Sequence, residues 1–452
     1  MKTDYSDMRI TVIGAGQTGL ALVRFLIERG ATVTLSDRRN AEEIQGLECL
    51  QGLPVQFDLG GHSREFFEQA DLVAISPGVP LGIEPLQLAS SMGIPLIGEI
   101  ELASRETASP IIAVTGTNGK STTVSMLGEI FHRWGKKTFV GGNLGTPLVE
   151  ACSEDWDFLV VELSSFQLET IENFSPRYGV LLNLSEDHLD RYPDLASYYA
   201  AKKRMFENMS ANQVAVLNAD DGQVMQLVAD STCRRVLFSG SDSLNEGLGR
   251  IGNELIWRWQ EKETRLPLDA LQLKGLHNVE NAMAAMIPAL LEGCPAELAW
   301  EAVCAFRGLP HRMALVRELD GVCWYNDSKG TNVGSVMKSL AGLAAPVTLI
   351  AGGKDKGGDY SVLRPHVEER VTDLILLGEA AARMEQQLVG SSRIHRVDSL
   401  AEAVELARGV TPAGGTVLLS PACASFDMFE NFAHRGDEFT RLVLQLEQGE
   451  AV

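Results

Sequence analysis

The sequence predicts an α/β protein of three domains, each built on a mostly parallel sheet. Short apolar runs rich in β-branched residues end in glycine-bearing turns, and helical periodicity follows several of these turns. The chain has 452 residues, which is more than one core accommodates, so about three domains of ordinary size are expected. We place these domains at residues 1–98, 99–308 and 309–452.

Composition argues against two classes of partner. The formal net charge is −21, whereas nucleic acids and anionic membranes bind basic surfaces. No apolar run reaches the length of a membrane span, and residues 1–7 carry acids and lack a secretory apolar core. The 7 cysteines are scattered without CxxC spacing, which indicates reduced thiols. We therefore expect a cytoplasmic protein with no membrane insertion and no nucleic acid partner.

The first domain is predicted to be Rossmann-like. A strand at residues 10–13 leads into Gly14-Ala15-Gly16-Gln17-Thr18-Gly19, and a second strand at residues 31–36 ends at Asp37. Such a turn within a βαβ unit binds a pyrophosphate, and an acid after the second strand binds a ribose hydroxyl. A third strand closes on Ser76-Pro77-Gly78, at the edge where open sheets bind ligands. The alternative is that these glycines serve only helix packing.

The central domain is predicted to be a P-loop ATPase domain. The apolar strand at residues 111–115 breaks into Gly116-Thr117-Asn118-Gly119-Lys120-Ser121-Thr122, and a helical pattern follows. Glycines let backbone N–H groups and a helix N-terminus face a phosphate, Lys120 adds a compact positive charge, and Ser121 is placed to hold Mg²⁺. The motif is shorter than the usual phosphate loop, and the alternative is an ordinary surface turn.

Two further strands of this domain end in candidate functional groups. Glu162 follows the buried run at residues 158–161, and a carboxylate beside a phosphate loop is the usual Mg²⁺ partner of the loop hydroxyl. His188, flanked by acids, follows the strand at residues 178–183. We expect Lys120, Glu162 and His188 on one rim of the sheet.

The third domain is again predicted to be Rossmann-like. After a Gly- and Pro-containing hinge at residues 308–312, buried strands run repeatedly into polar loops. These loops carry Lys329, Lys356 and Ser425. Lysines in glycine-containing loops after buried strands indicate an anion site.

Five segments occur in a characteristic order: residues 116–122, Glu162-Leu163-Ser164-Ser165-Phe166-Gln167, His277-Asn278, Asp327-Ser328-Lys329 and Ser420-Pro421-Ala422-Cys423-Ala424-Ser425. Together they resemble the Mur ligase family over essentially the whole chain. The N-terminal glycine turn is similar to the alanine- and glutamate-adding members, and residues 420–439 resemble the glutamate-adding one.

The resemblance implies roles for individual residues around ATP. It assigns the phosphates to the loop residues Gly116, Thr117, Asn118, Gly119, Lys120, Ser121 and Thr122, and the rest of the nucleotide to Asn278, Arg312 and Asp327. It assigns two Mg²⁺ ions to Ser121, Glu162, His188 and Lys202, with Lys202 carrying CO₂ as a carbamate. The carbamate is chemically sensible, because it turns a cation that would repel Mg²⁺ into an anionic oxygen ligand. From the residues alone, Lys202 belongs to an ordinary solvated basic face.

The resemblance also implies the two other substrates. UDP-N-acetylmuramoyl-L-alanine would be bound by Gln17, Thr18, Asp37, Arg39, Gly78, Asn143 and Lys329. D-glutamate would be received by Thr331, Lys356, Ser425 and Phe432. The implied reaction is ATP-dependent amide formation through an acyl phosphate, in peptidoglycan precursor synthesis, with Lys120, Glu162, His188 and Lys202 as the catalytic residues. A monomer is expected, with the third domain closing over the central one.

Three alternatives differ from this interpretation in chemistry. A nicotinamide-dependent oxidoreductase explains the first glycine turn but leaves the phosphate loop without a role. A nucleotide-regulated scaffold protein would hydrolyse ATP slowly and need no amino acid. A folylpolyglutamate synthase has the nearer chemistry, but its N-terminus lacks the UDP-type glycine turn.

Overall fold

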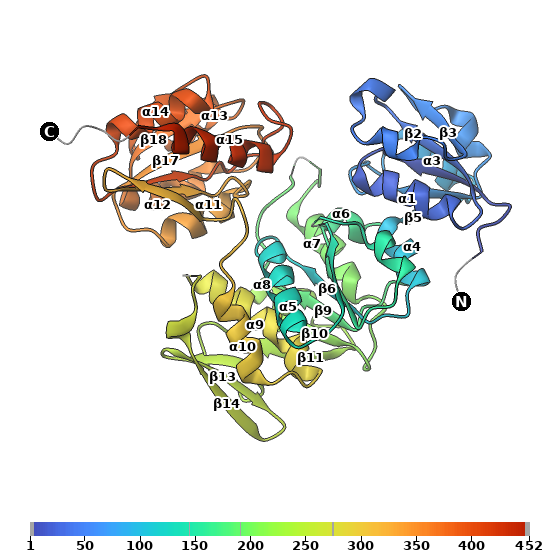
Figure 1. Cartoon of the computed structure of the whole chain (residues 1–452), viewed down its shortest axis with the longest axis horizontal. Coiled ribbons are helices and arrows are strands. Elements are labelled where there is room, and N and C mark those ends of the chain that lie inside the picture. Colours follow the sequence, from blue (N-terminus) through green and yellow to red (C-terminus); the bar gives the residue numbers. More distant parts are fainter. Residues whose placement is uncertain (1–3, 144, 190, 274, 448–452) are drawn as a thin grey trace. The chain divides into compact units, whose positions relative to one another are not determined.

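The computed structural model describes residues 4–143, 145–189, 191–273 and 275–447. The helices and strands form α/β bodies, each with its own sheet (Figure 1). By contacts, the chain divides into two compact units. Unit 1 comprises Met1–Asn183, Tyr198–Asp269 and Glu280–Val303, and unit 2 comprises Leu184–Ser197, Ala270–Val279 and Cys304–Val452.

The N-terminal sheet is parallel throughout, in the order β3-β2-β1-β4-β5. A Cβ on Gly19 would lie 1.8 Å from the carbonyl oxygen of Gly14, so the first turn of α1 packs directly on the glycine turn. The glycine therefore serves close helix packing, as the third glycine of such turns does. The elements are β1 (Arg9–Ile13), α1 (Gln17–Ile27), β2 (Thr32–Asp37), β3 (Val55–Leu59), α2 (Arg64–Glu68), β4 (Leu72–Ile75), α3 (Glu84–Ser91) and β5 (Leu96–Gly98), with η1 (Ala41–Glu43) and η2 (Leu47–Leu50).

The central sheet has the order β14-β13-β12-β11-β10-β9-β6-β8-β7. Pairing is parallel from β7 to β12 and antiparallel from β12 to β14. Its strands are β6 (Ile111–Thr115), β7 (Thr138–Gly142), β8 (Phe158–Glu162), β9 (Tyr178–Leu181), β10 (Val214–Asn218), β11 (Arg234–Phe238), β12 (Gly247–Ile251), β13 (Glu254–Trp259) and β14 (Lys262–Pro267). Its helices are α4 (Glu99–Glu106), α5 (Lys120–Arg133), η3 (Leu148–Ser153), α6 (Ser165–Leu168), α7 (Leu195–Lys203), η4 (Arg204–Phe206), α8 (Gly222–Leu227), η5 (Leu268–Ala270), α9 (Leu276–Leu291) and α10 (Ala296–Ala305).

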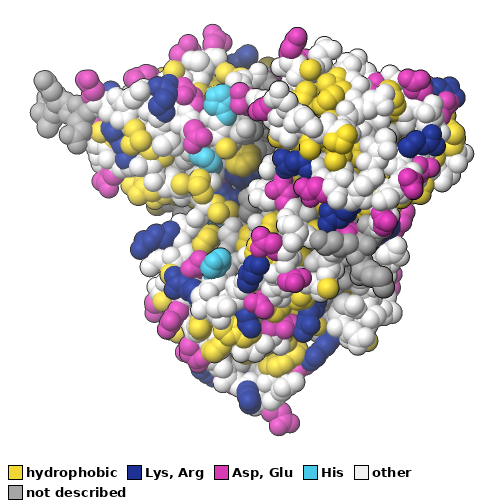
Figure 2. All heavy atoms as spheres, turned by 45° about the vertical axis from the view of Figure 1, so that its right-hand side comes forward, with side chains coloured by type: hydrophobic (Ala, Val, Ile, Leu, Met, Phe, Trp, Pro, Cys, Tyr) yellow, Lys and Arg dark blue, Asp and Glu magenta, His cyan; other side chains and the backbone are white. Residues whose placement is uncertain are grey.

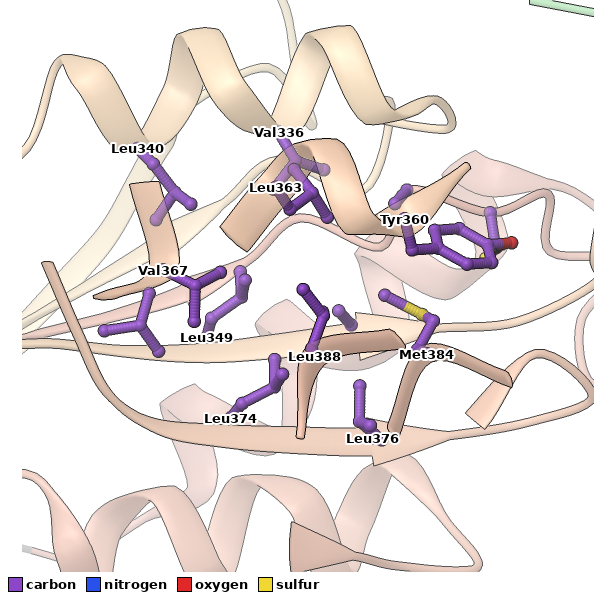
Figure 3. Close-up of a cluster of buried hydrophobic side chains, with 14 of the residues drawn as sticks. Val336, Leu340, Leu349, Tyr360, Leu363, Val367, Leu374, Leu376, Met384 and Leu388 are labelled. Carbon is purple, nitrogen blue, oxygen red and sulfur yellow. Dashed lines mark hydrogen bonds between the residues drawn. The ribbon is translucent and has the colours of Figure 1, made fainter. Parts of the chain in front are cut away.

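The C-terminal sheet has the order β15-β16-β20-β17-β18-β19, and among its described strands only β15 and β16 pair antiparallel. One face is covered by a core of Val336, Leu363, Met384 and other apolar side chains (Figure 3). The elements are β15 (Ala314–Leu319), β16 (Val322–Asn326), α11 (Val333–Ala341), β17 (Val347–Gly352), η6 (Tyr360–Leu363), α12 (Arg364–Arg370), β18 (Val371–Leu377), α13 (Ala381–Leu388), β19 (Arg393–Arg396), α14 (Leu400–Val410), β20 (Thr416–Leu419) and α15 (Phe432–Gln445).

The predicted fold class is confirmed, because the mixed α/β architecture has its sheets where the alternating strand and helix patterns placed them. The boundaries at 98 and 308 stay a prediction. On the face in Figure 2, basic and acidic side chains are interspersed rather than gathered into a basic patch. Within the described residues, none of the helices combines the length and apolarity needed to cross a bilayer.

Candidate active site

The turn after β6 has the backbone that a phosphate loop requires. All residues of β6 are buried, and the chain leaves the strand through Gly116 with φ +148°. Gly119, with φ +87°, is the N-cap of α5, and Lys120 is the first residue of that helix. Left-handed φ values favour glycine, so the two glycines permit the curl that presents N–H groups and a helix N-terminus together.

Two asparagines that the sequence analysis did not single out brace this loop. Asn183 accepts hydrogen bonds from the N–H of Thr117 at 3.0 Å and of Asn118 at 2.9 Å, and its side chain donates to the Asn118 carbonyl. Asn281 packs so closely that a Cβ on Gly119 would lie 2.2 Å from its Oδ1. Both asparagines lie far from the loop in sequence, so no local pattern reveals them.

The side chain of Lys120 folds back over the loop. Its Nζ donates to the carbonyl oxygens of Gly116 at 3.0 Å and Thr117 at 2.9 Å. Lys202 also reaches this loop, because its Nζ donates to the Gly116 carbonyl at 3.0 Å. Lys202 is 1% exposed and lies 4.6 Å from the ring centroid of Tyr198, so its side chain is not part of a solvated face.

Glu162 lies beside the mouth of the loop. It ends β8, and the parallel register pairs it with Val114, one residue before the end of β6. Its Oε1 accepts a hydrogen bond from Asn143 Nδ2 at 2.7 Å, which brings a residue predicted to contact the UDP substrate next to a predicted metal ligand. Glu162 and Ser121 are both 2% exposed. Lys120, Ser121, Glu162, Asn143 and Lys202 thus belong to one region of unit 1.

His188 belongs to the segment Leu184–Ser197 of unit 2. The adjacent Asp187 accepts hydrogen bonds from Lys356 Nζ and Asn332 Nδ2, each at 2.9 Å. Burial alone would raise the pKa of Asp187, but the positive charge of Lys356 lowers it well below its ordinary value. These residues line a cavity of about 160 Å³ together with apolar side chains such as Met337. Asp187 and Asn332 were not predicted as site residues.

Asp327 is a buried carboxyl inside unit 2. Its Oδ2 accepts hydrogen bonds from the hydroxyls of Ser339 and Ser420, each at 2.7 Å. Burial raises its pKa to about 6 in spite of these hydrogen bonds and of the charge of Arg312. Arg312 and Asn278, which were predicted with it to hold the nucleotide, are half-buried residues of the same unit.

The residues predicted to receive the amino acid lie in unit 2, three of them in loops and Phe432 at the first position of α15. Lys329 Nζ lies 3.8 Å from the ring centroid of Phe432. Ser425 is 2% exposed, and Thr331 is half-buried. A residue that was not predicted, Arg435, joins these loops: it donates to the Ser328 carbonyl at 2.9 Å and to the carbonyls of Cys423 and Ala424 at 3.2 Å.

The N-terminal glycine turn is tied to the acid after β2. Asp37 Oδ2 accepts from the Ala15 N–H at 2.6 Å and from Arg39 Nη2 at 2.9 Å. Burial would raise the pKa of Asp37, but the hydrogen bonds from Arg39 and Ala15 lower it to about 2. Gln17 and Gly78 are exposed and Thr18 is half-buried, at the carboxyl edge of the N-terminal sheet. Asp37 is therefore ionised and already paired within the chain.

Comparisons with known proteins identify the family. Models described as the Mur ligase MurD-like N-terminal domain, the Mur ligase middle domain and the Mur ligase glutamate ligase domain match residues 8–98, 114–289 and 311–423. The chain is 57% identical to UDP-N-acetylmuramoylalanine--D-glutamate ligase of Syntrophotalea carbinolica, over 98% of this chain and 99% of the relative. This chain belongs to the Mur ligase family. It is also 49% identical to the ligase of that name from Geotalea uraniireducens, over 98% of each chain.

Solved structures show the same fold for this Mur ligase. A pseudomurein peptide ligase type C from Methanothermus fervidus matches with a TM-score of 0.63 and 20% identity, covering 97% of this chain and 99% of the other. UDP-N-acetylmuramate-alanine ligase MurC from Thermotoga maritima matches with a TM-score of 0.61 and 20% identity, covering 96% and 98%. At this identity the likeness shows the architecture alone.

A magnesium ion fits the phosphate loop of this Mur ligase. Mg²⁺ takes few protein ligands and completes its octahedron with phosphate oxygens and waters. Ser121 and Glu162 provide a hydroxyl and a carboxylate at the mouth of the loop, and both are shielded from solvent. Among the described residues, no group of three or more His, Cys, Asp or Glu side chains could hold a metal unaided. The hydroxyl of Ser121 and the carboxylate of Glu162 suit an ion whose other ligands are phosphate oxygens of a nucleotide and waters.

Proposed function

We propose that this chain catalyses the ATP-dependent addition of D-glutamate to UDP-N-acetylmuramoyl-L-alanine, in the cytoplasm, during peptidoglycan precursor synthesis. The observation that carries this proposal is the full-length similarity to relatives named UDP-N-acetylmuramoylalanine--D-glutamate ligase, at 57% identity for one of them. The geometry supports it independently, because a glycine-bearing loop with Lys120, Ser121 and Glu162 is suited to a nucleoside triphosphate.

The chemistry begins with the activation of a carboxylate. A carboxylate oxygen of the L-alanyl group attacks the γ-phosphorus of ATP, the bond from that phosphorus to the β–γ bridging oxygen breaks, and ADP leaves. Charge spreads over the transferred phosphoryl group in this step, and Lys120 lies at the start of α5 to neutralise it. Mg²⁺, held by Ser121 and Glu162, would supply further neutralisation of the phosphate oxygens.

Amide formation follows from the acyl phosphate. The amine nitrogen of D-glutamate attacks the acyl carbon, inorganic phosphate leaves, and the nitrogen loses a proton. We assign the glutamate to Thr331, Lys356, Ser425 and Phe432. The loops of the first three are joined by backbone hydrogen bonds in unit 2, Phe432 begins α15 in the same unit, and Lys356 lines a cavity. His188 is the candidate proton acceptor, although we assign it first to metal binding.

Lys202 is the proposed carbamate. It is buried beside the Gly116 carbonyl, where the positive charge of an ammonium would repel the metal of the loop. A carbamate at this position would offer anionic oxygen, and we assign Lys202 and His188 to a second Mg²⁺ ion. The remaining assignments are Asn278, Arg312 and Asp327 to the nucleotide, and Gln17, Thr18, Asp37, Arg39, Gly78, Asn143 and Lys329 to the UDP substrate, all within one monomer.

One assay tests this function against its rivals. ADP release is measured with UDP-N-acetylmuramoyl-L-alanine and a panel of D- and L-amino acids, and release is expected only with D-glutamate. Release with a folate in place of the UDP substrate would indicate a folylpolyglutamate synthase. ATP hydrolysis that is independent of any amino acid would indicate a nucleotide-regulated scaffold, and a nicotinamide-dependent absorbance change would indicate an oxidoreductase.

A further inference from the structure

The loop that carries Lys356 is fixed at its base by backbone hydrogen bonds. It leaves β17 through Gly352 and Gly353, both with positive φ. Lys354 N–H donates to the Ala424 carbonyl at 2.9 Å, and Ala424 N–H donates back to the Lys354 carbonyl at 3.2 Å. This reciprocal pair ties the start of the loop to the segment that precedes Ser425.

Beyond this base, a single carboxylate organises the loop around Lys356. Asp355 Oδ1 accepts from the Gly357 N–H at 2.9 Å, so the carboxylate closes a tight turn with Lys356 at its centre. The same oxygen accepts from the Tyr360 hydroxyl at 2.8 Å, and Oδ2 accepts from Arg383 Nη1 at 2.8 Å. Burial would raise the pKa of Asp355, but these hydrogen bonds lower it, so the carboxylate stays ionised.

Arg383 clamps the loop on the far side of Lys356 as well. Its Nη2 donates to the Gly358 carbonyl at 2.9 Å and to the Gly357 carbonyl at 3.3 Å. One guanidinium therefore holds groups both before and after Lys356. A planar fork suits this task, whereas a lysine ammonium would reach only part of the set.

The helix that carries Arg383 packs on the hydrophobic core of the C-terminal sheet. Arg383 belongs to α13, and the next residue, Met384, is fully buried. Figure 3 shows Met384 close to the ring of Tyr360, whose hydroxyl points out of the cluster. The guanidinium lies over this ring, 5.6 Å from its centroid. The Arg383 side chain itself is 39% exposed, so the packing of the hydrophobic core does not depend on its guanidinium group.

We propose that Arg383 is a positioning residue for Lys356, and thereby for the carboxylate of the amino-acid substrate. It touches no reacting atom; it fixes the turn between Asp355 and Gly358 so that the Lys356 ammonium faces the cavity that it lines with Asp187 and Asn332. The inference rests on the proposed function, because it takes Lys356 to be part of the glutamate site.

The test compares steady-state kinetics of the full chain in four variants: Arg383→Met, Arg383→Lys, Asp355→Asn and the control Arg393→Met. Arg393 also pairs with an aspartate of the same body, Asp373 at 2.7 Å, but does not contact the Lys356 loop. For Arg383→Met we expect the KM for D-glutamate to rise about tenfold or more, with kcat and the KM for ATP changed less than about threefold. Arg383→Lys should raise the KM for D-glutamate less than Arg383→Met does. Added methylguanidinium should partly lower the raised KM of Arg383→Met.

Three results would overturn the proposal. An unchanged KM for D-glutamate in Arg383→Met is one, and an equal rise in the KM values of all substrates is another. The third is that Arg393→Met reproduces the effect. In the double variant Arg383→Met/Asp355→Asn, the fold increase in the KM for D-glutamate should be smaller than the product of the increases in the two single variants, because both residues act on one turn. A failure of the proposed function is recognised separately, because wild-type protein would then release no ADP in response to D-glutamate.

Discussion

At the scale of single residues, the buried side chain of Glu99 shows how its surroundings decide the protonation state of a carboxyl. Glu99 accepts backbone hydrogen bonds from Leu148 and Val149, the latter at 2.8 Å, but burial nevertheless raises its pKa to about 7 from an ordinary 4.5. The cost of desolvating the charged form therefore outweighs the hydrogen bonds that Glu99 accepts.

The raised pKa of Glu99 predicts a pH-dependent effect of Glu99→Gln. Because the folded-state pKa of Glu99 is raised, wild-type protein loses stability as the pH rises from 4.5 through 7. Glutamine keeps an acceptor for Val149 and does not titrate. The variant should therefore be more stable than wild type at pH 8, by at most roughly 3 kcal/mol, with little difference at pH 4.5. Melting temperatures at both values test this, and a pH-independent difference would contradict it.

Lys202 gives a second prediction at this scale. Lys202→Ala removes the proposed carbamate, and turnover should fall on the order of 100-fold, with no rescue by high bicarbonate. Lys203→Ala is the matched control, because Lys203 is the next residue of α7 but pairs with Asp230 and is 37% exposed. Steady-state ADP release measures both. Unchanged activity of Lys202→Ala would remove the carbamate from the mechanism.

At the scale of elements, the N-termini of two helices lie next to the predicted ATP-binding and metal-binding residues. The phosphate loop ends at the N-terminus of α5, and α6, which follows Glu162, begins with a capping box between Ser164 and Gln167. Such signals are local, which is why the strand, the loop and the helix at residues 111–133 could be predicted from sequence. The braces from Asn183 and Asn281 could not, because their partners are set by the packing of β9 and α9 against β6 and α5.

The two glycines at the ends of α5 provide an element-scale prediction. Alanine at Gly119 (φ +87°) would be strained and would place its Cβ 2.2 Å from Asn281 Oδ1. Alanine at Gly135 (φ +76°) would be strained equally but meet nothing within 4 Å. Both should cost about 1 kcal/mol of backbone strain, whereas only Gly119→Ala should raise the KM for ATP, by about tenfold or more. Equal KM values for ATP in both variants would contradict the role of Gly119 in the loop.

At the scale of the whole molecule, the sheets could be predicted from the sequence, whereas the tertiary contacts between residues of distant segments could not. Each sheet follows from local patterns of apolar runs and turns. The surroundings of Lys356 do not. Asp187 pairs with Lys356, Asn332 donates to Asp187, and Arg383 donates to the loop after Lys356. These three residues come from separate parts of the chain and carry no motif. Likewise, helical periodicity placed Lys202 on a solvated face, and only the tertiary structure buries it.

The predicted nucleotide residues are divided between the units, which leads to the last prediction. The loop at residues 116–122 belongs to unit 1, whereas Asn278, Arg312 and Asp327 belong to unit 2. Compact units with separate cores are expected to unfold in distinct calorimetric transitions. A ligand stabilises only what it binds, by about 2.7 kcal/mol at a concentration 100 times its Kd.

A non-hydrolysable ATP analogue with Mg²⁺ should therefore raise both transition temperatures if residues of both units contact the nucleotide. Gly119→Ala should weaken both shifts, because the loop provides the main phosphate contacts. Arg312→Met should selectively reduce the shift of the unit 2 transition, because it leaves the loop intact. If the analogue moves only the unit 1 transition in wild-type protein, then Asn278, Arg312 and Asp327 do not bind nucleotide, and the buried carboxyl of Asp327 serves the packing of its own unit.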